Sequence, residues 1–149
     1  VGNVIMIQNG GAFFGALMFA WMAQRFGRKP AFVVALISCA IVVPGAFWIS
    51  QTMLVAYVMF GLLGFALLTL FGGYAVYFPE LYPTRLRATG TGLCYNVARF
   101  LAAAAPWALG SLAASVGFKN AVLIVSSVFL LGLLVMPFAP ETKDRPLPE

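Results

Sequence analysis

The chain has 149 residues, of which 62% are hydrophobic and only 9% are charged, and its formal net charge is +5. Soluble domains carry roughly a quarter of charged residues, so this composition excludes an ordinary soluble protein. The basic residues lie in short loops between apolar segments, which indicates membrane topology rather than a nucleic-acid partner. The chain has no histidine, and Cys39 and Cys94 lie in separate apolar runs. We therefore expect no metal site, no cofactor and no enzymatic activity.

Five apolar segments follow one another, and each is long enough to cross a bilayer as a helix. Their expected ranges are about 2–23, 31–50, 53–78, 88–113 and 119–139. Backbone groups in hydrocarbon need partners within the chain, which favours helices. Runs such as Ala31–Val43 lack the alternation of a membrane β-barrel strand. The predicted fold class is therefore an all-α polytopic membrane protein, with kinks at Pro44 and Pro106.

The loops alternate in basic charge. Seven Lys and Arg residues lie in the first loop, the third loop and the segment 140–149, whereas the other side carries only Lys119. By the positive-inside rule, the first and third loops and the carboxyl-terminal segment 140–149 are cytoplasmic. The chain begins without an initiator Met and without a signal peptide, so we expect it to be a fragment of a longer protein.

The first motif is the basic turn over residues 24–30, Gln-Arg-Phe-Gly-Arg-Lys-Pro. Its glycine permits a tight reversal. The turn resembles the loop signature of the major facilitator superfamily, Gly-x-x-x-Asp-Arg-x-Gly-Arg-Arg/Lys. Ala20 and Gln24 replace the family's Gly and Asp, while four positions match: Arg25, Gly27, Arg28 and Lys29. Taken alone, such a turn is more often a plain topology anchor.

Two further motifs strengthen the resemblance. Glu80 and Arg87 stand seven residues apart, which is similar to the Glu-x6-Arg element between the tenth and eleventh helices of sugar porters and related metabolite–proton symporters. The segment 140–145, Pro-Glu-Thr-Lys-Asp-Arg, resembles the Pro-Glu-Thr-Lys-Gly-Arg segment after their last helix, with Asp144 in place of Gly. The three motifs occur in the family's order and spacing.

The resemblance implies that residues 1–149 form part of a transporter's carboxyl-terminal half, with helices corresponding to the eighth to twelfth. The amino-terminal half of the same polypeptide would be a partner. The expected function is secondary active transport of a small polar metabolite, a sugar or an organic acid, by alternating access. Proton coupling and a bacterial inner membrane are also implied. The alternative is a truncated or stand-alone five-helix membrane protein with a structural or assembly role.

The resemblance also implies a charge network that latches helices together on the cytoplasmic side. Glu80 and Glu141 would pair with Arg25, Arg28 and Arg87, beside Gly27 and Lys29 in the first loop. Such ion pairs would hold in the outward-facing state and loosen in the inward-facing one. The alternative is solvated interfacial charge, where an exposed pair contributes under about 1 kcal/mol.

Arg99 is the main candidate for substrate binding. It lies 12 residues beyond Arg87, about 18 Å along a helix, and an intramembrane arginine is costly enough to suggest a function. Gly92, Tyr95 and Asn96 share its helix face by spacing. Arg99 would bind a substrate carboxylate, or else pair with helix-end carbonyls or a carboxylate of the missing half. Two weaker candidates are Tyr74 and Gln8.

Overall fold

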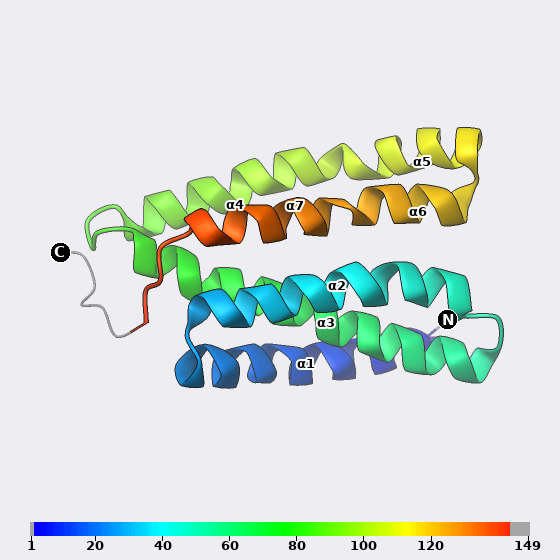
Figure 1. Ribbon diagram of the computed structural model, residues 1–149, viewed down its shortest axis with the longest axis horizontal. Coiled ribbons are helices and arrows are strands. Elements are labelled where there is room, and N and C mark those ends of the chain that lie inside the picture. Colours follow the sequence, from blue (N-terminus) through cyan, green and yellow to red (C-terminus); the bar gives the residue numbers. More distant parts are fainter. Residues whose placement is uncertain (1, 144–149) are drawn as a thin grey trace.

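The computed structural model describes residues 2–143, which form helices and loops with no strand among them (Figure 1). Its seven α-helices are α1 (Gly2–Arg25), α2 (Arg28–Ile49), α3 (Met53–Leu81), α4 (Arg87–Ala103), α5 (Ala105–Val116), α6 (Phe118–Ser126) and α7 (Val128–Val135). A short 3-10 helix, η1 (Met136–Phe138), follows α7. Together they make five spans that are long and apolar enough to cross a membrane, which confirms the predicted all-α membrane fold. The expected tail residues 144–149, including Asp144, lie outside the described part.

The fourth and fifth spans are each interrupted once. The fourth breaks at Ala104, two residues before Pro106, where the sequence predicts a kink. The fifth breaks at Ser127, whose hydroxyl donates a hydrogen bond to the Ile124 carbonyl at 2.6 Å. A serine that bonds the preceding turn competes with the backbone and bends helices. Helix α2, by contrast, runs through Pro44 without interruption.

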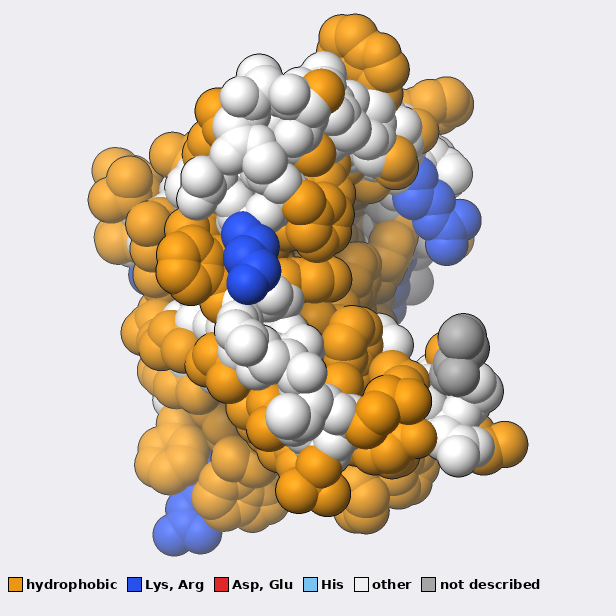
Figure 2. Space-filling model, turned by 90° about the vertical axis from the view of Figure 1, so that its right-hand side faces the viewer, with side chains coloured by type: hydrophobic (Ala, Val, Ile, Leu, Met, Phe, Trp, Pro, Cys, Tyr) orange, Lys and Arg blue, Asp and Glu red, His pale blue; other side chains and the backbone are white. Residues whose placement is uncertain are grey.

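The helices form two layers (Figure 1). One layer contains α1, α2 and α3, with α1 and α2 both packed on α3, and the other contains α4–α5 and α6–α7. The loops after α1 and α3 and the segment after η1 meet at one end, which we call the basic end. Figure 2 views the molecule from the opposite end, where mostly hydrophobic side chains are visible, with few basic ones and no acidic one. The fold thus gathers charge at one end.

Helices α1 and α3 approach each other through glycines, at which the backbone of one helix lies against the backbone of the other. A side chain at Gly11 would collide with the carbonyl of Gly61, and one at Gly64 would collide with the carbonyl of Gln8. The buried Thr69 hydroxyl donates to the Gly15 carbonyl across the same seam at 3.1 Å. In a membrane, such close backbone contact is the main source of helix association. The seam therefore fixes α1 on α3.

Substitution of Gly11 by Ala is expected to destabilise the protein by about 1–3 kcal/mol, because the added methyl group forces the two backbones apart. Gly10→Ala is the matched control, since a methyl group at Gly10 meets nothing within 4 Å. Thermal unfolding of the two purified variants in detergent measures the difference. Equal midpoints for the two variants would contradict the close packing of α1 on α3.

Candidate functional site

Arg28 and Glu80 form an ion pair at the basic end. Arg28 is the first residue of α2, and Glu80 lies in the last turn of α3, two residues beyond the predicted end of that helix. Arg28 Nε donates to Glu80 Oε2 at 3.0 Å, and Arg28 Nη2 donates to Glu80 Oε1. The two side chains are only 17% and 16% exposed. A bidentate pair shielded from solvent is stronger than an exposed one, so it connects α2 firmly to α3.

Glu141 binds the amino end of α2 through the backbone. The N–H of Arg28 donates to Oε1 at 2.8 Å, and the N–H of Lys29 donates to Oε2 at 3.0 Å. Gly27, at the N-cap position, has no side chain to satisfy these groups. A carboxylate 113 residues further along the chain therefore takes the place of the capping side chain, where it also complements the helix dipole.

Gly27 is required here for two reasons. Its φ of 104° lies in a region that L side chains rarely adopt. A Cβ at this position would also lie 3.0 Å from Glu141 Oε2, closer than nearly all Cβ contacts. The glycine thus both reverses the chain between α1 and α2 and makes room for the carboxylate.

The segment after η1 is tied to all three helices of the first layer. The Thr142 hydroxyl donates to Glu80 Oε2 at 2.5 Å, and the Tyr77 hydroxyl donates to the Pro140 carbonyl at 2.6 Å. The Lys143 ammonium donates to the Arg25 carbonyl at 2.9 Å. We call Arg28, Glu80, Glu141 and Thr142 the charge cluster. It joins three parts of the chain that are far apart in sequence.

Two arginines that the sequence places in this network have other partners. Arg87 Nε donates to the Pro79 carbonyl at 2.9 Å, and the Arg25 guanidinium lies 5.6 Å from the Trp21 ring centroid. Within residues 2–143, Arg28–Glu80 is the only ion pair. The expected pairing of Glu80 and Glu141 with Arg25 and Arg87 is therefore wrong for this structure. The carboxylate oxygens accept hydrogen bonds from Arg28, Thr142 and backbone N–H groups. The spacing of residues in the sequence does not predict these partners.

The backbone donors around Glu141 determine its protonation. Desolvation by burial would raise its pKa, but hydrogen bonds from the N–H groups of Arg28, Lys29, Lys143 and Thr142 outweigh that effect. The pKa of Glu141 is therefore held below its ordinary value of 4.5. Hydrogen bonds to the charged form favour that form, so Glu141 is ionised at neutral pH.

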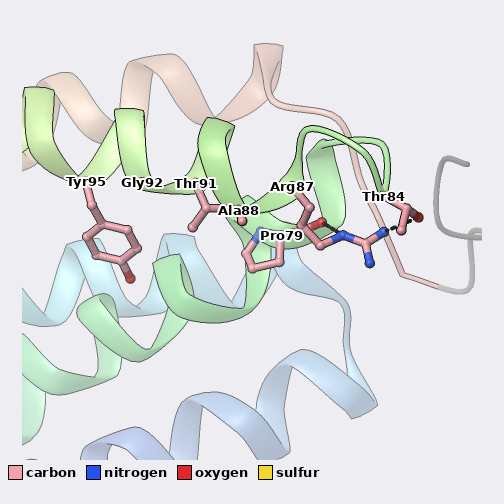
Figure 3. Close-up of a pocket in the computed structure, with 7 residues that line it drawn as sticks. All are labelled: Pro79, Thr84, Arg87, Ala88, Thr91, Gly92 and Tyr95. Atoms are coloured by element: carbon pink, nitrogen blue, oxygen red, sulfur yellow. Dashed lines mark hydrogen bonds between the residues drawn. The ribbon is translucent and has the colours of Figure 1, made fainter.

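A second feature of the basic end is an open pocket between α3 and α4, with a volume of about 610 Å³ (Figure 3). Arg87 lines its outer part, and Tyr95 lies two turns further along α4. The Tyr95 ring meets Phe78 edge to face, and Phe78 stacks on Tyr74. The structure thus brings Tyr95 and Tyr74 to one aromatic group. Thr91, which the sequence analysis missed, also lines the pocket, and its buried hydroxyl has no partner among the described residues.

The remaining candidates lie outside this pocket. Arg99 and Asn96 are exposed on α4, and the Asn96 amide donates to the Gly92 carbonyl at 2.8 Å. Gln8 is half-buried on α1. No residue of α4 is buried, so the polar face of this helix is open in the described part of the protein.

The lowered pKa of Glu141 predicts a pH-dependent stability. A carboxylate whose pKa is depressed by folding stabilises the protein above its unfolded pKa, and this contribution is lost as the pH falls through the lower folded value. Glu141→Gln is expected to cost about 1 kcal/mol at pH 7 and to flatten the pH profile below 4.5. Unfolding measured from pH 7 to pH 3 checks this, and a profile that parallels the wild type would refute the capping role.

Comparison with known proteins supports the membrane fold and shows to which family the chain is similar. The model of the Major Facilitator Superfamily matches residues 1–149. A putative metabolite transport protein of Haemophilus influenzae is 29% identical over 136 residues, which cover 89% of this chain and 33% of that protein. The sialic acid transporter NanX of Escherichia coli is 32% identical over 139 residues, covering 91% of this chain and 34% of its own length.

A third relative, the cis,cis-muconate transport protein of Acinetobacter baylyi, is 30% identical over 134 residues, covering 89% of this chain and 32% of that protein. The chain therefore spans about a third of the length of the curated relatives it matches. A family model that matches the whole chain, together with five helices long and apolar enough to span a membrane, leads to one conclusion: the chain belongs to the Major Facilitator Superfamily and is part of an integral membrane protein.

Proposed function

We propose that the full protein is a secondary active transporter that moves a small organic acid across the bacterial inner membrane by alternating access. The chain would contribute part of the carboxyl-terminal half, and the amino-terminal half of the same polypeptide would complete the cavity. Two of the relatives are transporters of organic acids, namely sialic acid and cis,cis-muconate. The family match over the whole chain favours this function over a structural or assembly role.

The observation that carries the proposal is the position of Arg99. It lies in the fourth span, 12 residues from Arg87 at the start of that span, and it is exposed. A guanidinium at that depth is costly in contact with lipid. A water-filled cavity between two halves of a transporter removes this cost, and a substrate carboxylate there would form a charge-assisted, bidentate bond with the guanidinium. A neutral sugar would leave the charge unpaired, so the organic acid is the better substrate class.

The charge cluster is proposed to act as a latch on the cytoplasmic side. It joins α2, α3 and the segment after η1 through one bidentate pair and one capping carboxylate. In the outward-facing state these bonds would be intact, and they would break or rearrange as the cytoplasmic side opens. The excess of basic residues at this end supports its cytoplasmic location, with the carboxyl terminus inside.

Proton coupling is part of the proposal, and it requires a proton-carrying group elsewhere in the protein. Glu80 is the only carboxylate in the five described spans, and Arg28 already holds it at the end of α3. The proton-carrying group would therefore lie in the amino-terminal half. Proton uptake that accompanies substrate uptake, and that is lost when acidic residues of that half are neutralised, would support this assignment.

Arg99→Gln in the full transporter is expected to lower the affinity for an organic acid at least about tenfold, because a charge-assisted hydrogen bond is lost. Arg85→Gln, a change of the same type in the loop after α3, is the control and should transport normally. Uptake of labelled sialic acid, muconate and a neutral sugar into vesicles measures this. Unchanged uptake of every organic acid that the wild type transports would refute the role of Arg99.

Glu80→Gln is expected to shift the resting state towards the inward-facing form, since Arg28 loses a charged partner. Accessibility of single cysteines on the cytoplasmic side to a membrane-impermeant reagent, in inverted vesicles, should rise several-fold. Thr84→Ala, a change at the same end outside the charge cluster, serves as the comparison. Equal accessibility in Glu80→Gln and the wild type would count against the latch.

A further inference from the structure

A second cleft at the basic end lies between the start of α2 and the end of α7. It has a volume of about 470 Å³ and is lined by Lys29, Pro30, Val33, Val34, Leu133, Met136 and Pro137. Among the described residues, Lys29 is the only charged one in this lining. Val33 and Val34 lie four and five residues further along α2, about 6–8 Å deeper in the span. The cleft is thus cationic at its rim and apolar towards the membrane interior.

The Lys29 ammonium is available to bind an anion. Its Nζ donates to the Pro137 carbonyl at 3.1 Å, and an ammonium group has two further donors. Glu141 binds the backbone N–H of Lys29, and within residues 2–143 no carboxylate lies within ion-pair distance of the Lys29 side chain. The surrounding end is strongly basic. Its described side chains include two acids, Glu80 and Glu141, and six bases: Arg25, Arg28, Lys29, Arg85, Arg87 and Lys143.

The apolar walls of the cleft continue into the outer surface of two spans. Val34 is 46% exposed on α2, and Leu134, next to the wall residue Leu133, is 68% exposed on α7. Exposed apolar side chains of this kind on membrane-spanning helices are suited to contact with hydrocarbon. The cleft therefore opens onto an apolar surface that suits lipid chains, with its cation at the level of the helix ends.

We propose that this cleft binds an anionic phospholipid. The phosphate would accept hydrogen bonds from the Lys29 ammonium, and one acyl chain would lie against Val33, Val34 and Leu133. Free phosphate would make no apolar contact with the walls of the cleft. A zwitterionic lipid has no net charge, so it would not neutralise the excess positive charge of the basic end. Basic clefts between membrane helices are suited to anionic head groups. A lipid bound here would bridge α2 and the segment around Pro137, close to the charge cluster.

Lys29→Gln in the full protein tests the proposal, since it removes the ammonium and keeps the backbone N–H that Glu141 binds. Lys119→Gln, at the opposite end, is the matched control. Each purified variant is reconstituted in phosphatidylcholine nanodiscs with and without phosphatidylglycerol, and retained phosphatidylglycerol is measured by native mass spectrometry. We expect about fivefold weaker retention for Lys29→Gln and no change for Lys119→Gln.

Val34→Trp provides a second test that leaves the charge in place. The larger side chain would fill the apolar part of the cleft and should also weaken retention, whereas added inorganic phosphate should not displace the lipid from the wild type. Retention in both Lys29→Gln and Val34→Trp equal to the wild type would overturn the proposal. Displacement by inorganic phosphate would overturn it as well, because the site would then recognise the anion alone.

Discussion

Hydrocarbon cannot form hydrogen bonds, and this constraint governs the architecture of the whole chain. Every backbone group within the membrane must find its partner in the protein, so five apolar runs become five helical spans. Where two of them break, at Ala104 and Ser127, the freed groups are bonded to the preceding turn. Helices then associate mainly by close contact, which the glycine seam between α1 and α3 provides. Among the described spans, every charged side chain except Arg99 then lies near a helix end.

The charge cluster shows what those ends can do. Glu80 and Glu141 lie 61 positions apart in the sequence, yet one binds the Arg28 side chain and the other binds the amino end of the same helix. Three elements thus share one small set of polar contacts, shielded from solvent at the membrane surface. Such a set is stable when complete and weak when one partner moves, which suits a latch between two states. The Lys29 cleft lies directly beside it.

Much of the fold could be predicted from the sequence, because membrane spans depend on length and hydropathy, which are local properties. The contacts of the site could be predicted only in part. The motifs indicated that Arg28, Glu80 and Glu141 gather at one end, but the capping of α2 by Glu141 depends on how a distant segment folds back. The sequence predicts Glu80 in a loop, whereas α3 continues through Pro79 to Leu81. The sequence does not predict the position of Thr91, because this residue lines a pocket that forms only when two helices pack together.

The central claim is that Arg28 and Glu80 act as one unit that joins α2 to α3. A double-mutant cycle with Arg28→Gln and Glu80→Gln, measured by thermal unfolding of the full protein, tests it most directly. For neighbours in one network, the account predicts a coupling energy of about 1–3 kcal/mol, so that the double variant is hardly less stable than either single one. Additive losses, with a coupling energy near zero, would mean that the two side chains act separately and would contradict the account.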